Sequence, residues 1–190
     1  MTALDRPVDL RSDTVTRPTP EMRRAMAEAE VGDDAYREDP TVRRLESLAA
    51  GLLGKEAALY VPSGTMANQL ALRVLARPGT EVLCGERAHV FRYENAAAAV
   101  NAGVQLRPLP DAGGTLTAAD VTRAAASQHH HLPTISALFL ENTHMPACGR
   151  PWRTAELEAV TAVAHEHGLA VHCDRAGIWK PAIALGVATR

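Results

Sequence analysis

Residues 135–174 read ISALFLENTHMPACGRPWRTAELEAVTAVAHEHGLAVHCD. This stretch opens with an apolar run at 135–140 and closes with another at 169–173, and a helix-forming segment from Thr154 to Gly168 lies between them. Short apolar runs bounded by turn residues are typical of buried strands, whereas the central segment has the length of a helix. The pattern predicts a strand–helix–strand unit whose two strands lie parallel.

The same alternation extends toward the N-terminus. Further apolar strands are predicted at 57–61, 81–84 and 104–108, and further helices at 64–75, 88–102 and 117–127. Strands that alternate with helices form parallel sheets covered on both faces. The predicted fold class is therefore α/β, a three-layer sandwich around a mostly parallel sheet.

The first forty residues differ from the rest because four prolines interrupt regular structure there: Pro7, Pro18, Pro20 and Pro40. A short helix is predicted from Pro20 to Glu30, since proline suits the first helical turn. An amphipathic helix is predicted from Pro40 to Leu53, where apolar residues recur at helical spacing. We therefore divide the chain into an N-terminal arm with a short helix, residues 1–40, and one large domain, residues 41–190.

Composition limits the classes of partner and location. A net charge of -2 gives no reason to expect nucleic acid or an anionic membrane as partner. No apolar run has the length of a membrane span, and residues 1–11 contain no apolar signal core. The three cysteines form no CxxC pair, which favours a reducing compartment over a disulfide framework. The cytoplasm is the expected location.

The turn Ser63–Gly64–Thr65 lies where a predicted strand leads into a predicted helix. Glycine permits a close backbone approach, the hydroxyls can donate hydrogen bonds, and a helix N-terminus attracts anions. The turn is thus a candidate phosphate site, although the same residues would also suit a turn that only caps a helix. The pattern GxGxxG is absent, which argues against a dinucleotide site.

Polar side chains follow three of the predicted strands: His89, the segment Glu141–His144, and Asp174. Ligands of open α/β sheets bind at the carboxyl ends of the strands, where these residues are expected. Each has a plainer interpretation as well. His89 would suit a surface or helix-capping position, Glu141–His144 a hydrogen-bonded loop, and Asp174 a helix N-cap.

The remaining histidines do not predict a metal site. They are His129, His130, His131, His165, His167 and His172. His165 and His167 are two residues apart and do not share a helix face. Neither HExxH nor a zinc-type Cys/His spacing is present, so we predict no metal.

Four segments together resemble the low-specificity L-threonine aldolases, which are pyridoxal-phosphate (PLP) enzymes of the aspartate-aminotransferase-like fold group. The segments are DLRSDTVTRPTP at 9–20, VGDDAYREDPT at 31–41, PSGTMAN at 62–68 and ENTH at 141–144. The resemblance runs in register from about Val8 to Arg190. It implies cleavage of a small β-hydroxy amino acid, L-threonine or L-allo-threonine, to glycine and acetaldehyde.

The resemblance also implies roles for the residues after the strands. Gly64 and Thr65 match the positions that bind the PLP phosphate, and His89 matches the histidine that stacks on the pyridine ring. Asp174 matches the carboxylate that pairs with the pyridine nitrogen. His144 matches a candidate base for the substrate hydroxyl, acting directly or through water.

Two positions of the N-terminal arm match residues near the substrate. They are Ser12 and Tyr36, and the latter implies a homo-oligomer, a dimer or tetramer, because it reaches the site of a neighbouring subunit. Near the other end, family members read Asp-Gly-Ala-Arg where this chain has Asp174-Arg175-Ala176-Gly177. Arg175 is two positions from the place of the family arginine, so its side chain starts elsewhere and points elsewhere. It is a substrate-binding candidate that the displacement weakens.

The lysine that holds PLP in the family comes a few tens of residues after the matching aspartate. Lys55 and Lys180 are the two lysines of this chain, and neither has that place. The resemblance therefore predicts a large domain truncated before this lysine and before the small domain, and inactive by itself. In the family the seven strands run in the order 3-2-4-5-6-7-1, so strands six and seven would lie beyond Arg190.

Two other interpretations stay open at this point. The chain would also suit a truncated or decayed homologue that binds PLP weakly or binds only a partner chain, which the displaced arginine and the lysine positions favour. The second interpretation is an unrelated module that binds a nucleotide or phosphate ester at Gly64–Thr65. The matching N-terminal arm disfavours this interpretation, since such a module does not need that arm.

Overall fold

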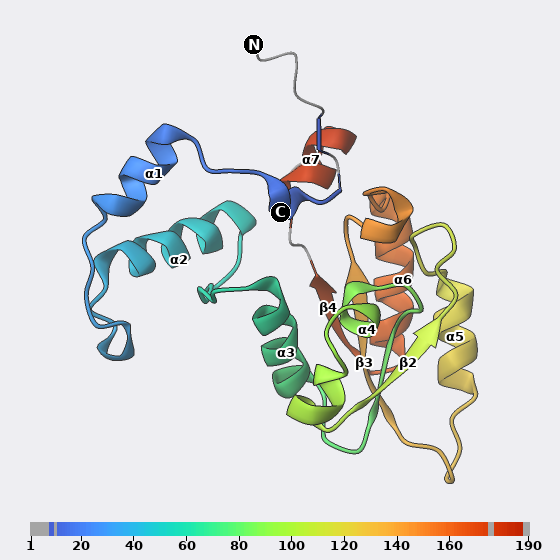
Figure 1. Ribbon diagram of the computed structural model, residues 1–190. Helices are drawn as coiled ribbons and strands as arrows, with labels where there is room; N and C mark the ends of the chain where they lie inside the picture. Colours follow the sequence, from blue (N-terminus) through green and yellow to red (C-terminus); the bar gives the residue numbers. More distant parts are fainter. Residues whose placement is uncertain (1–7, 10, 175–176, 188–190) are drawn as a thin grey trace. The chain divides into compact units, whose positions relative to one another are not determined.

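A computed structural model of the chain describes residues 8–9, 11–174 and 177–187. It divides into two compact units, Met1–Tyr60 and Val61–Arg190. The second unit contains a sheet of four strands, β1 (Glu81–Gly85), β2 (Gln105–Leu109), β3 (Ile135–Glu141) and β4 (Ala170–Asp174). All of its neighbouring strands are parallel and lie in the order β2-β1-β3-β4 (Figure 1). The order 3-2-4-5 implied for these four strands is confirmed.

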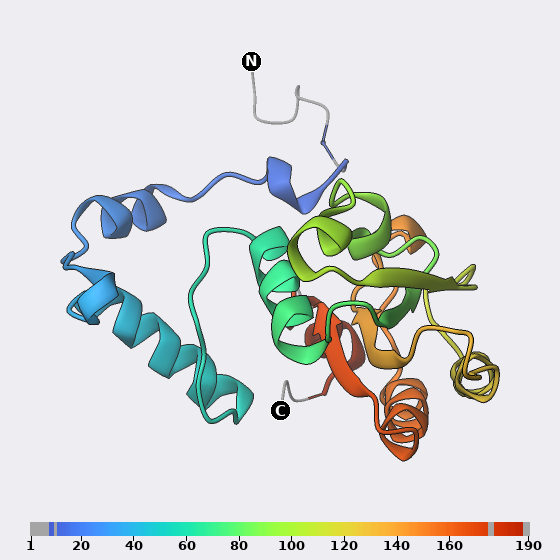
Figure 2. The ribbon, with the colours of Figure 1, turned by 90° about the horizontal axis from the view of Figure 1, so that it is seen from below.

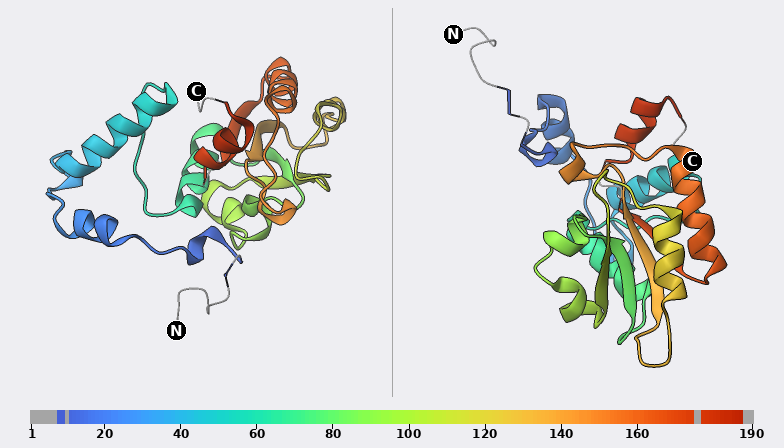
Figure 3. Two further views of the ribbon diagram at one scale, coloured as in Figure 1. Left: turned by 90° about the horizontal axis from the view of Figure 1, so that it is seen from above. Right: turned by 90° about the vertical axis from the view of Figure 1, so that its right-hand side faces the viewer.

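Helices cover both faces of this sheet (Figure 3, right). One face carries α3 (Gly64–Leu75), α4 (His89–Arg92) and the wide turn η4 (Ala98–Ala102), and the other carries α5 (Ala118–Ala126) and α6 (Thr154–Glu166). The predicted α/β class, with helices on either side of a parallel sheet, is confirmed.

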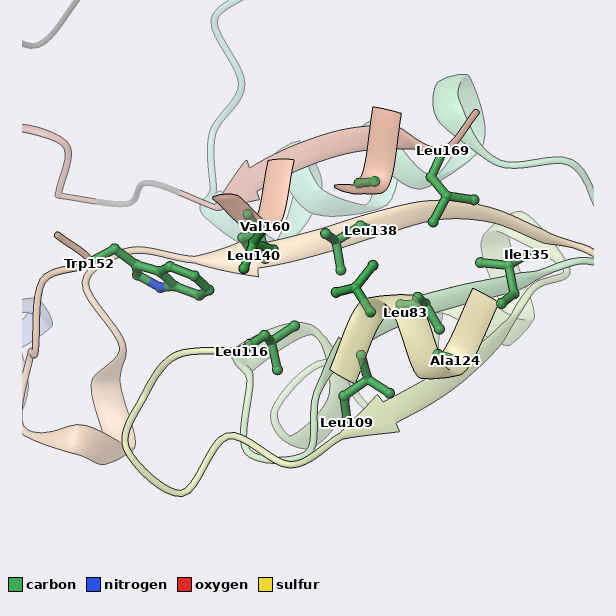
Figure 4. Packing of buried hydrophobic residues seen from close by; sticks show 12 residues of the cluster. Leu83, Leu109, Leu116, Ala124, Ile135, Leu138, Leu140, Trp152, Val160 and Leu169 are labelled. Carbon is green, nitrogen blue, oxygen red and sulfur yellow. The ribbon is translucent and has the colours of Figure 1, made fainter. Parts of the chain in front are cut away.

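Strand alternation sorts the apolar side chains into two cores, one on each face. Leu83, Leu138 and Leu140 pack with α5 and α6, whereas their strand neighbours Val82 and Phe139 pack with α3, α4 and η4. In the first core Trp152 lies at one end and Ile135 and Leu169 at the other (Figure 4). β1 is buried along its whole length and β3 at every residue except Ser136, so both strands hold their carboxyl ends in fixed positions.

The first unit contains α1 (Pro20–Ala27), α2 (Pro40–Leu53) and two short 3-10 turns, η2 (Asp13–Val15) and η3 (Asp34–Tyr36). Proline begins both helices and the preceding side chain caps each of them: Thr19 accepts from the backbone N–H of Met22, and Asp39 accepts from that of Val42. The two backbone N–H bonds of Asp39, from Val42 and Gly32, hold the pKa of its carboxyl below the usual range. Both predicted helices are present, although the first ends at Ala27 rather than Glu30.

Residues 57–61, predicted as a strand, are irregular. No strand in the part of the chain that the structure describes pairs with them. The backbone N–H of Tyr60 donates instead to Glu46 Oε1 in α2, at 2.8 Å. A strand requires a neighbour for its backbone groups, so apolar composition alone was not sufficient here.

One further prediction is corrected, and one helix was not predicted. The helix expected at 88–102 is broken, because Asn95 and Ala96 have positive φ angles of 51° and 58°, a conformation that no α-helix accommodates. The helix α7 (Trp179–Leu185) was not predicted. Among the described residues, no helix has the length and apolarity required to cross a bilayer.

Candidate active site

The carboxyl edge of the sheet gathers polar side chains from three strands and one helix. His89 follows β1, Glu141 ends β3, and Asp174 ends β4. Asn68, in the second turn of α3, donates from Nδ2 to Asp174 Oδ2 at 2.8 Å. This hydrogen bond brings the beginning of α3 to the carboxyl end of β4, and Figure 2 shows the helix beside that strand.

Asn68 is the centre of a buried hydrogen-bond network. Its Nδ2 donates to both Asp174 and Glu94 Oε1, each at 2.8 Å, and its Oδ1 lies 2.9 Å from Nε2 of His172. Glu94 also accepts from Gln69 Nε2 at 2.7 Å, and its Oε1 lies 2.9 Å from Nδ1 of His89. We call this set the carboxylate network: Asn68, Gln69, His89, Glu94, His172 and Asp174.

The break in the predicted helix 88–102 occurs directly after Glu94. The side chain of Glu94 is fully buried and makes three contacts within the carboxylate network. The left-handed residues Asn95 and Ala96 redirect the chain immediately after it. The irregular backbone thus coincides with the placement of a buried carboxylate, a combination that is frequent at functional sites.

Glu141 connects the carboxylate network to the following loop. Its Oε2 accepts from the backbone N–H of His89 at 2.7 Å, and its Oε1 accepts from that of Met145 at 2.8 Å. Trp152 donates from Nε1 to the backbone oxygen of Glu141 at 2.9 Å. The loop that carries His144 is therefore tied to the end of β3 at several points, and the short turn η5 (Met145–Ala147) follows it.

The side chain of His144 is buried, with 3% of the residue's surface exposed. Its Nε2 lies 2.9 Å from Oδ2 of Asp111, which is equally buried. Asp111 accepts from the backbone N–H and from Nε of Arg87, at 3.1 and 3.2 Å. Asp111 thus links the guanidinium of Arg87 to the imidazole of His144, near the carboxyl end of β1.

The turn Ser63–Gly64–Thr65 forms the N-terminus of α3. Ser63 Oγ accepts from the backbone N–H of Met66 at 3.1 Å, so this hydroxyl caps the helix. A Cβ built on Gly64 would meet no atom within 4 Å, and Thr65 is exposed. The structure therefore brings this turn to the same edge of the sheet as His89, His144 and Asp174, with open space beside it.

Three other residues singled out from the sequence lie in the unit Met1–Tyr60 or outside the described residues. Ser12 and Tyr36 belong to the unit Met1–Tyr60, where Ser12 Oγ accepts from the backbone N–H of Thr14 and Tyr36 is 78% exposed. Arg175 lies outside the described residues. Their predicted contacts with the substrate therefore stay predictions.

One group of potential metal ligands occurs within the described residues. Ligand atoms of His89, Glu94 and Asp174 lie within 4.8 Å of one another. The amide of Asn68 donates to both carboxylates of this group, and His89 Nδ1 faces Glu94. A hydrogen-bond donor thus holds the two carboxylates together, in the manner expected of a satisfied buried network.

Burial lowers the pKa of His172 below its ordinary value of 6.5, against the opposing effect of Asp174 and Glu94. Unfolding exposes the ring and restores that value, so the unfolded chain binds more protons as the pH falls through 6.5. We expect the free energy of unfolding to decrease on acidification from about pH 7.5 to about pH 5.5, and to decrease less in His172→Gln.

Urea unfolding at the two pH values measures this difference. His167→Gln is the matched control because it removes an exposed histidine. A wild-type pH dependence in His172→Gln would contradict the assignment of the effect to this ring.

Cys84 lies in β1 on the face opposite to Leu83 and is fully buried. Burial, with a smaller contribution from the negative charge of Asp111, raises the pKa of its thiol to about 12. A thiol of this kind stays protonated at neutral pH and is therefore inert as a nucleophile or metal ligand.

The members of the site that were not identified from the sequence alone include Asn68, Glu94 and Asp111. Asn68 lies within the quoted segment 62–68, one helical turn after Gly64, and that position was the available signal. Asp111 precedes Ala112-Gly113-Gly114, which indicated only a loop. Glu94 gave no signal, because its burial depends on the break at Asn95.

Comparisons with known proteins identify the family of the chain. A family model described as "Beta-eliminating lyase" matches residues 9–190. The chain is 42% identical over 186 residues to low-specificity L-threonine aldolase 1 of Arabidopsis thaliana, covering 96% of this chain and 52% of that protein. It is 41% identical over 180 residues to the low specificity L-threonine aldolase of Escherichia coli K12, covering 94% and 53%. The chain thus spans about half the length of these curated relatives.

A solved structure of a threonine aldolase from Leishmania major superposes with a TM-score of 0.69 at 24% identity. The superposition covers 80% of this chain and 44% of that one. At this level of identity the likeness concerns the fold.

Proposed function

Because the chain belongs to the beta-eliminating lyase family, we propose that it forms the cofactor-binding part of a PLP-dependent lyase. The proposed reaction cleaves a small β-hydroxy amino acid, such as L-threonine or L-allo-threonine, to glycine and acetaldehyde. One observation carries the proposal: Asn68, one turn inside α3, holds the Asp174 carboxylate at 2.8 Å. A ligand that binds both the helix N-terminus and Asp174 needs an anion at one end and a basic nitrogen at the other, as PLP has.

The residues at this edge fit that cofactor. The open N-terminus of α3 at Gly64–Thr65 would hold the phosphate, because its backbone N–H groups and helix dipole favour an anion. Asp174 would pair with the pyridine nitrogen. His89, with 35% of its side chain exposed, would lie against the ring. When bound, PLP supplies an electron sink for the charge left at Cα as the carbon–carbon bond breaks.

The chain's own contribution to the reaction is proton handling and orientation. His144 would accept the proton of the β-hydroxyl group, as a base held on a loop that Glu141 and Trp152 fasten to β3. The carboxylate network would keep Asp174 and His89 in place, since both are hydrogen-bonded through buried partners.

The N-terminal unit supports a second part of the proposal. Tyr36 is 78% exposed on η3, which leaves its side chain available to a site on another subunit, and Ser12 is the N-cap of η2. We propose a homo-oligomer, a dimer or tetramer, in which these residues approach the substrate. A cytoplasmic location and a substrate contact by Arg175 likewise belong to the proposal.

A non-catalytic homologue is the alternative function, and the lysines favour it for residues 1–190. Lys55 follows α2 in the other unit, and Lys180 is exposed on α7. We expect residues 1–190 to bind PLP weakly and to release no glycine or acetaldehyde from L-allo-threonine, because covalent attachment of PLP requires a suitably placed lysine.

Absorbance spectra with added PLP, followed by borohydride reduction and peptide mapping, test this expectation. A reduced adduct on Lys180, with activity that Lys180→Ala abolishes, would overturn it. Asp174→Asn is expected to weaken PLP binding roughly 10- to 100-fold, the value of a hydrogen bond to a charged group. Glu158→Gln, which alters an exposed carboxylate on α6, is the matched control. Equal affinity in the two variants would contradict the role of Asp174.

A further inference from the structure

Asp111 presents its carboxylate to two different donors. Oδ2 lies 2.9 Å from His144 Nε2 and accepts from the backbone N–H of Arg87, while Oδ1 accepts from Arg87 Nε. Arg87 also donates from Nη2 to the backbone oxygens of Asp111 and Ala112, which fixes the guanidinium beside the carboxylate. An ionised carboxylate only accepts hydrogen bonds. Nε2 of His144 must therefore carry the hydrogen in this contact.

A neutral imidazole has one N–H group and one lone pair. Once Nε2 carries the hydrogen, the lone pair is at Nδ1. We infer that Asp111 is a positioning residue that holds His144 in this tautomer, so that Nδ1 is the atom that accepts the proton of the substrate hydroxyl. The inference rests on the proposed function for the identity of the substrate, whereas the tautomer follows from the contacts alone.

Nδ1 of His144 is itself an unusual atom. It is buried and has no hydrogen-bond partner among the described residues, where no other buried side-chain nitrogen or oxygen lacks one. Buried polar atoms in native proteins are paired as a rule, and an exception calls for a donor from outside the chain. His144 and Asp111 also line a cavity of about 10 Å³, the size of about one water. One water would satisfy Nδ1 before a substrate hydroxyl replaces it.

Two glycines allow this arrangement. A Cβ on Gly85, at the end of β1, would collide with Oδ2 of Asp111. A Cβ on Gly114 would lie 2.6 Å from Cβ of Ala147 and 3.3 Å from Cβ of His144, and Gly114 has a φ of +80°. The backbone thus leaves room for Asp111 and His144 in one position, as a preorganised base requires.

Nitrogen-15 spectra of the protein from the gene's complete reading frame, with labelled histidine, test the tautomer directly. His144→Gln assigns the resonances. We expect the hydrogen on Nε2, protected from exchange with solvent, and none on Nδ1. In Asp111→Asn, exchange of the Nε2 hydrogen should accelerate roughly 10-fold or more, because its charged acceptor is lost. Glu158→Gln, which alters an exposed carboxylate on α6, should leave that exchange unchanged.

Kinetics of the protein from the gene's complete reading frame separate the inference from the proposed function. Asp111→Asn is expected to lower kcat about 10²- to 10⁴-fold, the range of a general base, with KM and PLP affinity little changed. Hydrogen on Nδ1 in the wild type, or an unchanged kcat in Asp111→Asn, overturns the inference. A wild type with hydrogen on Nε2 but no aldolase activity overturns the proposed function and leaves the tautomer assignment standing. If Asp111→Asn does not fold, the wild-type spectrum still decides the tautomer.

Discussion

Residues 1–190 expressed alone are expected to self-associate or to remain partly folded, because β4 pairs on one side only within the described residues. An unpaired strand edge presents backbone N–H and C=O groups that another chain can pair with. The side chains of β4 increase this tendency, since Val171 and Cys173 pack against one core and Ala170 against the other. The carboxylate of β4, Asp174, stands at its end and accepts from Asn68, so the rest of the strand lacks the charges that protect natural edges.

Sedimentation velocity over a range of concentrations measures the association. Hydrogen exchange locates it, because backbone amides of β4 that point away from β3 should exchange faster than those of the buried strands β1 and β3. Ile183→Lys on α7 is the control for general surface stickiness, since Ile183 is 81% exposed. A monomer that melts cooperatively, with β4 protected as well as β3, would contradict this expectation.

The sequence predicted the sheet better than its surroundings. β1, β3 and β4 consist mainly of apolar residues, and such runs in a chain of alternating strands and helices are typical of a buried parallel sheet, whereas β2 also contains Gln105 and Arg107. The run at 57–61 has the same composition but no neighbouring strand among the described residues. Strand formation depends on a partner far along the chain, which a local pattern does not reveal. The strand prediction was therefore wrong at 57–61, where no partner strand is described, and was confirmed at 135–140, where β1 and β4 are the partners.

The helix at 88–102 failed for a different reason. Alanine-rich sequence favours a helix at every position from 96 to 99, yet Asn95 and Ala96 adopt positive φ angles. The buried contacts of Glu94 with Asn68 and Gln69 are tertiary, so their effect on the backbone was not visible in the local propensities. The family resemblance, confirmed by the match over residues 9–190, named residues that would touch the ligand. The resemblance did not identify Asn68, Glu94 and Asp111, which hold those residues in place through hydrogen bonds.

The division between ligand-facing and supporting residues has a physical basis. Gly64, His89 and Asp174 stand directly after or between predicted elements, so their place at the carboxyl edge follows from topology. Asn68, Glu94 and Asp111 act through hydrogen bonds to residues far along the chain, such as those from Asn68 to Glu94 and to Asp174, which are 26 and 106 residues away. Contacts of that range require the three-dimensional structure.

Replacing Glu94 by alanine is expected to lower the free energy of unfolding by about 3 kcal/mol or more. The side chain is fully buried, and its removal leaves one N–H of Asn68 and one of Gln69 without an acceptor and removes the partner of His89 Nδ1. Urea unfolding followed by circular dichroism at low protein concentration measures the loss. Glu86→Ala, which removes an exposed carboxylate nearby, should change stability by less than about 0.5 kcal/mol.

Glu94→Gln separates the loss of hydrogen bonds from the loss of volume. The amide oxygen of the new side chain can accept from Asn68, while its NH₂ group meets the NH₂ group of Gln69. Gln69 can turn its own amide to present oxygen, and in doing so it gives up only the long bond of 3.4 Å from Asn101. The expected cost is therefore about 1 kcal/mol. If the two variants lose equal stability, the network does not depend on acceptors at this position, and the burial of Glu94 would have to be explained by packing alone.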